Sequence, residues 1–394
     1  MSWLTRAGAA AAVKRNRRAP LLILLLAAVF ALAVPRPAPD HVPFGEQQNV
    51  ETANPLLCVH TLLENEVQEA KIKRSLVLAR ELGATTIVQF FPWAYHEPSK
   101  GRFNWERADR ILGHANRQGL QVIARLGLVP AWARPSGPDQ PSTLNYLPAE
   151  SFEDFARYAA AFARRYAEAV KALIIWNEPN LSFEWGYRQV DPAAYARLLR
   201  VSYEQVKAAN PDMQVLAGAL APTLERRGSA AGLNELEYLS AMYRQGAGDV
   251  FDALAIHTYG FRDPPAAEPN RERLNFRRAE LLREVMIAHG DGDKPAFITE
   301  FGWNDHPRWT SAVRPSQRSA YTIRAYDYAK SNWDWLESLC LWALRYPADL
   351  LSYPDNFTLV SADFSKKPIY FALQDYSRQR ARSEALWLPP PLDG

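Results

Sequence analysis

The sequence of 394 residues has few cysteines, methionines and histidines, with two, four and seven of them. Two cysteines exclude a cysteine-rich metal cluster and a small disulfide-dense domain, and no histidine and cysteine group has the spacing of a zinc site. No glycine-rich phosphate loop follows the first expected strand, which argues against dinucleotide-binding and P-loop folds. We therefore expect neither a metal ion nor a cofactor.

The excess of positive charge is confined to the amino terminus. The chain has a net charge of +3, but residues 1–39 hold six basic residues and no acidic one, which leaves −3 for the remainder. A mildly acidic body lacks the electrostatic footprint of a nucleic-acid-binding protein. We expect no nucleic acid among its partners.

An uncharged apolar run, residues 19–34, follows the basic amino terminus. It is just short of the lower limit of about 17 residues for a membrane-spanning helix, and Ala31-Leu32-Ala33 resembles a signal-peptidase site. Two outcomes are open: a cleaved signal peptide over residues 1–34, which gives a secreted protein, or an uncleaved transmembrane anchor. Both place the body outside the cytoplasm. The proline-spaced residues 35–50 are predicted to form an extended linker.

Strand-like and helix-like patterns alternate eight times over residues 51–385, and residues 386–394 form a tail. Strands are expected at 55–60, 85–90, 121–126, 172–176, 214–219, 253–257, 294–299 and 338–342. Helices are expected at 66–82, 104–118, 150–169, 192–209, 234–244, 271–289, 316–331 and 367–382. This alternation predicts an α/β fold, a single (β/α)8 TIM barrel. The alternative is a doubly wound open sheet, which fits less well because the sequence lacks the phosphate-binding loop of that fold.

The two cysteines, Cys58 and Cys340, fall on the first and last of these strands, which are neighbours in a closed barrel. Their places in the strand alternation indicate that both side chains point inward. Because disulfides between adjacent parallel barrel strands are uncommon, we expect two buried free thiols. A disulfide between them is the alternative.

Two short apolar strands run into a glutamate. Residues 172–175 lead into Trp-Asn-Glu-Pro-Asn, where Pro179 ends the strand, and residues 294–299 lead into Glu300. The carboxyl ends of barrel strands are where TIM barrels hold their active sites, and strands four and seven lie nearly opposite each other. Two such glutamates are what a glycosidase requires: one protonates the leaving oxygen, and the other acts as nucleophile or base.

The residues around both glutamates resemble motifs of glycoside hydrolase clan A. Trp-Asn-Glu-Pro-Asn-Leu at 176–181, with Phe183 and Trp185 behind it, is closest to the acid/base motif of family 39, the β-xylosidases and α-L-iduronidases. Ile-Thr-Glu-Phe-Gly-Trp at 298–303 looks more like the nucleophile motif of family 5. One motif close to family 39 and one close to family 5 indicate the same reaction, glycoside hydrolysis, but they leave the substrate class open.

This resemblance implies hydrolysis of an oligo- or polysaccharide, with β-linked bonds, by double displacement with retention of configuration. Glu178 would be the acid/base and Glu300 the nucleophile, with their carboxyl groups about 5–5.5 Å apart. The resemblance also implies that Asn177 binds the substrate 2-hydroxyl, that Tyr259 holds the nucleophile carboxylate, and that Trp342 forms a floor for the sugar. A structural turn or core role is the alternative for each of these three.

Other strand ends supply further candidates for substrate binding. His257 and Tyr259 alternate on strand six so that both face inward. Arg125 on strand three would be costly to bury unpaired, which predicts that its guanidinium points to a carboxylate such as Glu300. Further cleft candidates, each with a structural role as its alternative, are His60, Trp93, Tyr95, Glu97, Trp132, Trp185 and Trp303.

Two other function classes fit less well. A catalytically silent barrel that binds cell-surface glycan has no need of both glutamates, and a cytosolic enzyme acting on phosphorylated metabolites needs a phosphate-binding motif. The sequence predicts no particular sugar, no preference for exo or endo action and no oligomeric state.

Overall fold

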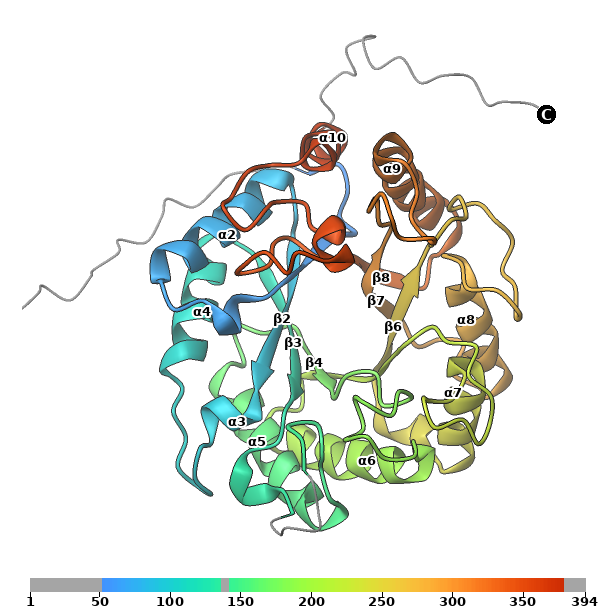
Figure 1. The fold of residues 1–394 in the computed structure, drawn as a ribbon. Coiled ribbons are helices and arrows are strands. Elements are labelled where there is room, and N and C mark those ends of the chain that lie inside the picture. The colour runs from blue at the N-terminus through green and yellow to red at the C-terminus, as the bar shows by residue number, and fades with distance from the viewer. Residues whose placement is uncertain (1–51, 136–141, 379–394) are drawn as a thin grey trace, which may run out of the picture. The chain divides into compact units, whose positions relative to one another are not determined.

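The computed structural model describes residues 52–135 and 142–378. Within them, eight parallel strands form a closed barrel in chain order, and β8 pairs with β1 (Figure 1). The strands are β1 (Leu57–Thr61), β2 (Thr86–Pro92), β3 (Gln121–Gly127), β4 (Ala172–Ile175), β5 (Gln214–Leu220), β6 (Ala253–Tyr259), β7 (Ala296–Gly302) and β8 (Leu336–Leu341). The predicted (β/α)8 TIM barrel is confirmed. The predicted signal or anchor segment and the linker lie outside the described residues.

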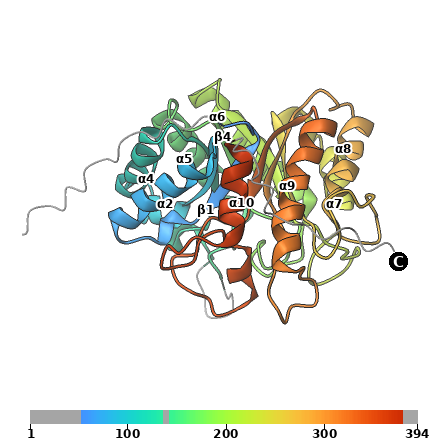
Figure 2. The same ribbon diagram turned by 90° about the horizontal axis from the view of Figure 1, so that it is seen from above.

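Helices cover the outside of the strands (Figures 1 and 2). The α-helices are α2 (Glu69–Leu82), α3 (Trp93–His96), α4 (Glu106–Arg117), α5 (Phe152–Arg165), α6 (Pro192–Ala209), α7 (Glu235–Arg244), α8 (Arg278–Ala288), α9 (Pro315–Asn332) and α10 (Pro368–Ser377). The 3-10 turns are η1 (Leu63–Asn65), η2 (Ala131–Ala133), η3 (Ala149–Ser151), η4 (Ala247–Val250) and η5 (Tyr353–Phe357). In the described part of the chain, no helix has the length and apolar character needed to span a bilayer.

Local sequence signals set several helix ends. Helix α2 ends at Gly83, whose φ of 98° is the left-handed conformation that glycine adopts without strain. Helix α6 begins where the Asp191 side chain accepts hydrogen bonds from two backbone N–H groups, with Pro192 in its first turn. Helix α8 begins at Arg278, later than predicted, because the buried Arg278 guanidinium binds the backbone carbonyls of Asn270 and Arg271 and holds that segment as a loop.

The last helix closes the outer layer over the seam between the last and first strands. Helix α10 contacts both α9 and α2 and lies beside them in both ribbon views (Figures 1 and 2). The hydroxyl of Tyr370 donates a hydrogen bond to the carbonyl of Leu78 at 2.8 Å. The first and last parts of the described chain therefore contact each other twice, through α2 and α10 on the outside of the barrel and through β1 and β8 within it.

Cys58 and Cys340 form a disulfide, so the expectation of free thiols is wrong. Strands β1 and β8 pair with Cys58 directly opposite Cys340, and the two Cα atoms are 4.1 Å apart. Both side chains belong to the buried cluster that fills the barrel interior, together with side chains such as Ile174 and Phe297. Because both residues face inward at the same level, their sulfur atoms are close enough to bond. The bridge covalently joins the strands that close the barrel.

Candidate active site

Glu178 and Glu300 lie in the same region but in different backbone settings, one in a turn and the other in a strand. Strand β4 ends at Ile175, and Glu178 follows in a turn with a positive φ of 39°. That conformation is uncommon for a residue with a side chain, and the backbone N–H of Glu178 is held by the carbonyl of Ala219 at 3.0 Å. Strand β7 continues past Glu300, so this glutamate lies inside the strand, whereas the sequence predicted it just after the strand end.

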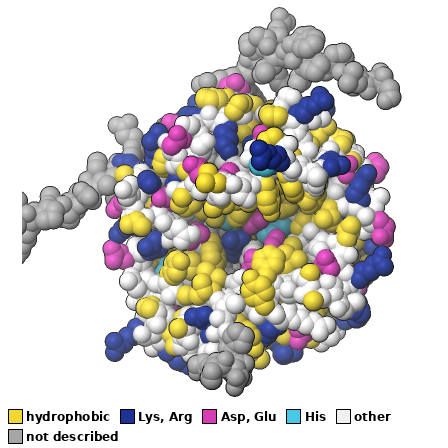
Figure 3. Space-filling view, in the orientation of Figure 1, with side chains coloured by type: hydrophobic (Ala, Val, Ile, Leu, Met, Phe, Trp, Pro, Cys, Tyr) yellow, Lys and Arg dark blue, Asp and Glu magenta, His cyan; other side chains and the backbone are white. Residues whose placement is uncertain are grey.

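The two carboxylates meet beside His257. The Nδ1 atom of His257 lies 2.7 Å from Oε1 of Glu178 and 3.6 Å from Oε2 of Glu300. One oxygen of each glutamate and a ring nitrogen of His257 all lie within 4.8 Å of one another. The side chains of Glu178 and Glu300 keep 15% and 8% of their surface exposed, so both are reachable from solvent. Figure 3 shows a hollow in which acidic, basic and histidine side chains gather, framed by hydrophobic side chains.

Both oxygens of Glu300 accept hydrogen bonds from neighbouring strands. Arg125 on β3 donates from Nη1 to Oε1 at 2.9 Å, and the hydroxyl of Tyr259 on β6 donates to Oε2 at 2.8 Å. The same Nη1 atom of Arg125 donates to Oδ1 of Asn177 at 2.7 Å. The Nε2 atom of His60 lies 3.7 Å from Oε1 of Glu300. Charge-assisted hydrogen bonds of this kind stabilise the ionised carboxylate and fix its orientation.

The surroundings give the two carboxyls different protonation behaviour. Burial raises the pKa of Glu178 to about 7, against a smaller lowering effect of Arg125. Burial also raises the pKa of Glu300, whereas His257, Arg125 and the Tyr259 hydroxyl favour its ionised form. The hydrogen bonds from Arg125 and Tyr259 favour the ionised form of Glu300, whereas the nearby Glu178 raises the pKa of Glu300 further. Of the two carboxyls, only Glu300 accepts a hydrogen bond from a guanidinium, and this difference in surroundings favours different protonation states for the pair.

His257 is neutral at that pH. Burial lowers its pKa to about 4, although the Glu300 carboxylate opposes the shift. A neutral imidazole nitrogen is either a donor or an acceptor. Nδ1 can therefore accept the proton of Glu178 in a hydrogen bond, or donate to the carboxylate after Glu178 has lost its proton. The 2.7 Å contact can persist in both states.

Among the described residues, Glu178, His257 and Glu300 are a group with the spacing to hold a metal ion. The hydrogen bonds from Arg125 and Tyr259 already engage both oxygens of Glu300. A metal ion would have to displace or share these donors, and it would face the positive guanidinium of Arg125. The donor set therefore fits a hydrogen-bonded pair of carboxyls better than a metal site, and the absence of a metal stays a prediction.

The end of β8 contributes Trp342 to the same region. Its ring lies 4.5 Å from the ring of His60 in an edge-on arrangement, and its Nε1 donates to the hydroxyl of Tyr346 at 3.0 Å. His60 is fully buried, so it lies behind Glu300 and does not line the open cleft as predicted. Its Nδ1 contacts the carbonyl of Thr61 at 3.1 Å. We conclude that His60 supports Glu300 from behind and that Trp342 packs against His60.

Two of the predicted substrate-binding tryptophans, Trp93 and Trp303, are structural, and those predictions are wrong. Trp93 is fully buried and donates from Nε1 to the carboxylate of Glu97, itself fully buried, at 2.6 Å. The chain after β2 forms the short helix α3, which turns Trp93 inward against α5. Trp303 is 1% exposed and donates from Nε1 to the carbonyl of Asp263 at 2.8 Å. Neither indole has a face left for a sugar.

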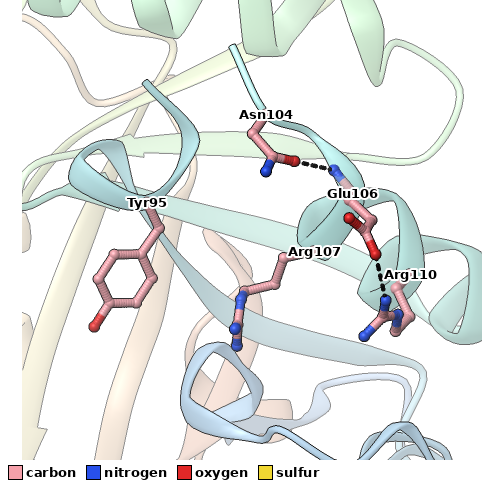
Figure 4. Close-up of a pocket in the computed structure, with 5 residues that line it drawn as sticks. All are labelled: Tyr95, Asn104, Glu106, Arg107 and Arg110. Carbon is pink, nitrogen blue, oxygen red and sulfur yellow. Dashed lines mark hydrogen bonds and ion pairs between the residues drawn. The ribbon is translucent and has the colours of Figure 1, made fainter. Parts of the chain in front are cut away.

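Three further aromatic candidates also have structural neighbours. Trp185 is buried and packs edge-on against Trp176. Trp132 donates from Nε1 to the carbonyl of Glu97 at 2.8 Å. Tyr95 is exposed, and it lines a pocket of about 390 Å³ at the start of α4 instead of the hollow around the glutamates (Figure 4). The other residues that line this pocket are Asn104, Glu106, Arg107 and Arg110.

A third carboxyl, that of Glu184, was not predicted from the sequence. It follows Glu178 in the loop between β4 and α6, and its Oε2 accepts a hydrogen bond from Nδ2 of Asn145 at 3.1 Å. Burial and the nearby Glu178 carboxylate raise the pKa of Glu184 to about 7, and Arg125 and a contact with Asn177 oppose the shift. The signal available in the sequence was an acidic residue between the two aromatic residues, Phe183 and Trp185, that follow the acid/base motif.

Comparisons with known proteins point to the glycoside hydrolases. Residues 63–143 match a family model described as beta-galactosidase, and residues 135–346 match the model described as glycosyl hydrolase catalytic core. A probable beta-galactosidase C of Sclerotinia sclerotiorum is 44% identical over 52 residues, which are 12% of this chain and 5% of that protein. The chain thus spans only a small part of this curated relative.

Solved structures of glycoside hydrolases share the barrel. A family 39 glycoside hydrolase from Bacteroides cellulosilyticus has a TM-score of 0.62 and 23% identity, over 82% of this chain and 64% of that one. A monomeric beta-xylosidase from Caulobacter crescentus has a TM-score of 0.57 and 19% identity, over 82% and 69%. An exo-beta-1,4-mannosidase from an Opitutaceae bacterium has a TM-score of 0.57 and 17% identity, over 86% and 62%. At these identities, the likeness shows the fold alone.

The two motifs that resemble clan A, at 176–181 and 298–303, both lie within the matched residues 135–346, and the recognition of that clan is confirmed. The catalytic-core model covers more than half of the chain, including both Glu178 and Glu300. The chain therefore belongs to the glycosyl hydrolase catalytic core family.

Proposed function

We propose that the protein is a retaining glycoside hydrolase that cleaves β-linked bonds of an oligo- or polysaccharide by double displacement. The observation that carries this proposal is the approach of the Glu178 and Glu300 carboxyl oxygens to within 4.8 Å. Retaining enzymes hold their two carboxyl groups about 5–5.5 Å apart, whereas inverting enzymes leave about 6.5–9.5 Å for a water molecule. Membership of a glycosyl hydrolase family supports the reaction class.

In the first step, an oxygen of Glu300 attacks the anomeric carbon, and the bond to the leaving oxygen breaks. Glu178 gives its proton to that oxygen, so the leaving sugar departs as an alcohol. The pKa of Glu178, raised to about 7 by burial, keeps this proton in place until it is needed. Arg125 and Tyr259 hold the attacking carboxylate through hydrogen bonds of 2.9 and 2.8 Å.

In the second step, water attacks the anomeric carbon and releases the sugar from Glu300. Glu178, now a carboxylate, takes the proton of that water. Esterified Glu300 carries no charge, and the mutual repulsion that raises the pKa of a carboxyl pair is therefore gone. The pKa of Glu178 falls, which suits its role as a base next to neutral His257.

Contacts of Asn177 support the role that the clan resemblance implies. Its Oδ1 accepts a hydrogen bond from Arg125 at 2.7 Å. This bond orients the amide group, and its NH2 group, which also contacts Glu184, has a second N–H to donate toward a substrate hydroxyl. Trp342, next to His60, offers an apolar surface beside the same site. We assign Asn177 to the 2-hydroxyl of the sugar that Glu300 attacks, and Trp342 to the face of that sugar.

An extracytoplasmic location belongs to the same proposal. The Cys58–Cys340 disulfide is of the kind that forms and persists in oxidising compartments outside the cytoplasm. The basic and apolar amino-terminal segment 1–34 would direct the chain there, either as a cleaved signal peptide or as a membrane anchor. A carbohydrate polymer outside the cell is a substrate that such a location makes accessible.

Replacing each glutamate separately tests the proposed roles. Glu300→Gln should abolish turnover of every substrate, because no nucleophile remains. Glu178→Ala should lower kcat/KM by about 10²–10⁴-fold for natural glycosides, and much less for 4-nitrophenyl glycosides, whose leaving group needs no proton. Added azide should restore the rate of Glu178→Ala as a glycosyl azide forms.

The matched control is Glu337→Gln, because Glu337 is an exposed carboxylate at the opposite, amino-terminal end of β8. Equal residual rates for both active-site variants on every substrate would contradict the role assignment. If the wild-type protein turned over no 4-nitrophenyl glycoside but was retained on polysaccharide columns, a glycan-binding barrel would replace the enzyme.

A further inference from the structure

We propose that Trp309 and Tyr353 form an aromatic platform for a further sugar of the substrate, beyond the two sugars that the cleaved bond joins. The protein would then prefer chains longer than a disaccharide. This inference rests on the proposed glycosidase function, because the platform serves a substrate that is cleaved between Glu178 and Glu300. It concerns loops after β7 and β8 that the catalytic steps above do not use.

A row of aromatic rings leads from the nucleophile to the platform. The hydroxyl of Tyr259 donates to Glu300 at 2.8 Å, and the centre of the Tyr259 ring lies 6.3 Å from that of Phe261. The ring of Trp309 lies 6.2 Å from Phe261 and stacks on Tyr353 at 5.1 Å. Phe261 and Trp309 are half-buried, and Tyr353 is 45% exposed. The row therefore runs from the hollow around the two glutamates to solvent.

Hydrogen bonds between the loops hold the platform in place. Nδ2 of the fully buried Asn304 donates to the carbonyl of Tyr353 at 2.7 Å, which ties the loop after β7 to the turn η5. Nε of Arg262 donates to the carbonyl of Thr310, the neighbour of Trp309, which ties the loop after β6 to the loop after β7. Because the rings are presented from anchored loops, binding orders little that is not already ordered.

The chemistry of the platform suits a sugar. A sugar ring has apolar faces, which pack against aromatic rings, and polar edges, which need hydrogen-bonding groups. The same two loops supply such groups, since Nδ2 of Asn356 donates to Oδ1 of Asp305 at 3.1 Å and both side chains are partly exposed. A carboxylate offers about four acceptor sites, so Asp305 keeps acceptor capacity for hydroxyl groups. Hydrophobic side chains also frame the hollow itself (Figure 3).

The consequence of such a platform is a dependence of the rate on chain length. A disaccharide fills the two positions at the cleaved bond and leaves the platform uncovered, whereas a longer chain covers it. Contacts with remote parts of a substrate contribute to transition-state binding. Because burial of one aromatic face is worth at least about a factor of ten, kcat/KM should rise at least about tenfold from disaccharide to hexasaccharide.

The test measures kcat/KM of the full-length protein on β-linked xylo-, gluco-, galacto- and manno-oligosaccharides of two to six sugars, in the series whose disaccharide is hydrolysed. Trp309→Ala should lower kcat/KM for the hexasaccharide about tenfold, mainly through KM. Its effect on the disaccharide should be several-fold smaller. Trp309→Phe keeps an aromatic face and should restore most of the rise with chain length.

A second variant and a matched control complete the experiment. Tyr353→Ala removes the exposed ring of the platform and should also flatten the length dependence, which keeps the test open if Trp309→Ala does not fold. Phe371→Ala removes a ring that is 50% exposed on α10, on the outside of the barrel, and should leave the rates on all chain lengths unchanged.

A wild-type kcat/KM that does not depend on chain length would overturn the proposal, and so would a rise that persists in both Trp309→Ala and Tyr353→Ala. Equal losses on disaccharide and hexasaccharide in these variants would also overturn it, because residues that only pack the loops together would act in that way. Failure of the glycosidase proposal would look different: the wild-type protein would hydrolyse no oligosaccharide and no 4-nitrophenyl glycoside, and both proposals would fall.

Discussion

Raising the pH from about 6 to about 9 should lower kcat/KM of this protein about 90-fold on a glycoside with a poor leaving group. Glu178, the proposed general acid, must carry a proton, and burial raises its pKa to about 7. A group that is active when protonated is fully active below its pKa and loses about tenfold in activity for each pH unit above it. The decline should therefore begin near pH 7.

The other titratable groups of the site give this decline a clear assignment. Burial lowers the pKa of His257 to about 4, so this ring does not change charge over the alkaline range. The pKa of Tyr259 is raised well above 10 by burial and by the Glu300 charge. On the acidic side, activity should fall as Glu300 takes up a proton, at a pH above 4.5 because burial raises its pKa. A bell-shaped profile is expected.

Glu184 is the competing source of an alkaline decline, since its pKa is also about 7. Initial rates on a phenyl glycoside, measured from about pH 4 to pH 10, separate the two glutamates. Glu178→Gln should be slower by about 10²–10⁴-fold and flat on the alkaline side, whereas Glu184→Gln should keep the decline whatever its absolute rate. A decline that persists in Glu178→Gln and disappears in Glu184→Gln would refute the assignment of the acid.

Two further perturbations test the structure around the pair. Tyr259→Phe removes the 2.8 Å hydrogen bond to Glu300. The acidic limb of the pH profile should then move up by about one to two pH units, because such a bond contributes about 1.5–3 kcal/mol. An unmoved limb would show that the hydroxyl does not bind the carboxylate. The double variant Cys58→Ala, Cys340→Ala removes a disulfide that joins residues 282 positions apart. The free energy of unfolding, measured in urea, should fall by about 4–5 kcal/mol. An unchanged value would show that the disulfide does not contribute to stability.

The sequence alone was enough to predict the barrel and the two glutamates at its mouth. Strand and helix periodicities, Gly83 after α2 and the capping Asp191 are local signals, because each depends on residues only a few positions apart. The convergence of Glu178 and Glu300 was also predictable, although they are far apart in the chain. Barrel closure brings all carboxyl strand ends to one face, so a pattern of strand ends is enough to place them there.

Other features depended on side-chain contacts that only the tertiary structure defines. Pairing of Cys58 with Cys340 required the register between β1 and β8, and one residue of slippage would have sent one thiol to the other face. From the sequence, Trp93 was expected to be an exposed aromatic residue in a loop, but it begins helix α3 and its side chain is buried. The hydrogen bond from Asn145 to Glu184 joins two different loops, and no local pattern in the sequence predicts it. Local chain chemistry determined which elements form, whereas contacts between distant elements decided which side chains line the hollow around Glu178 and Glu300 and which are buried.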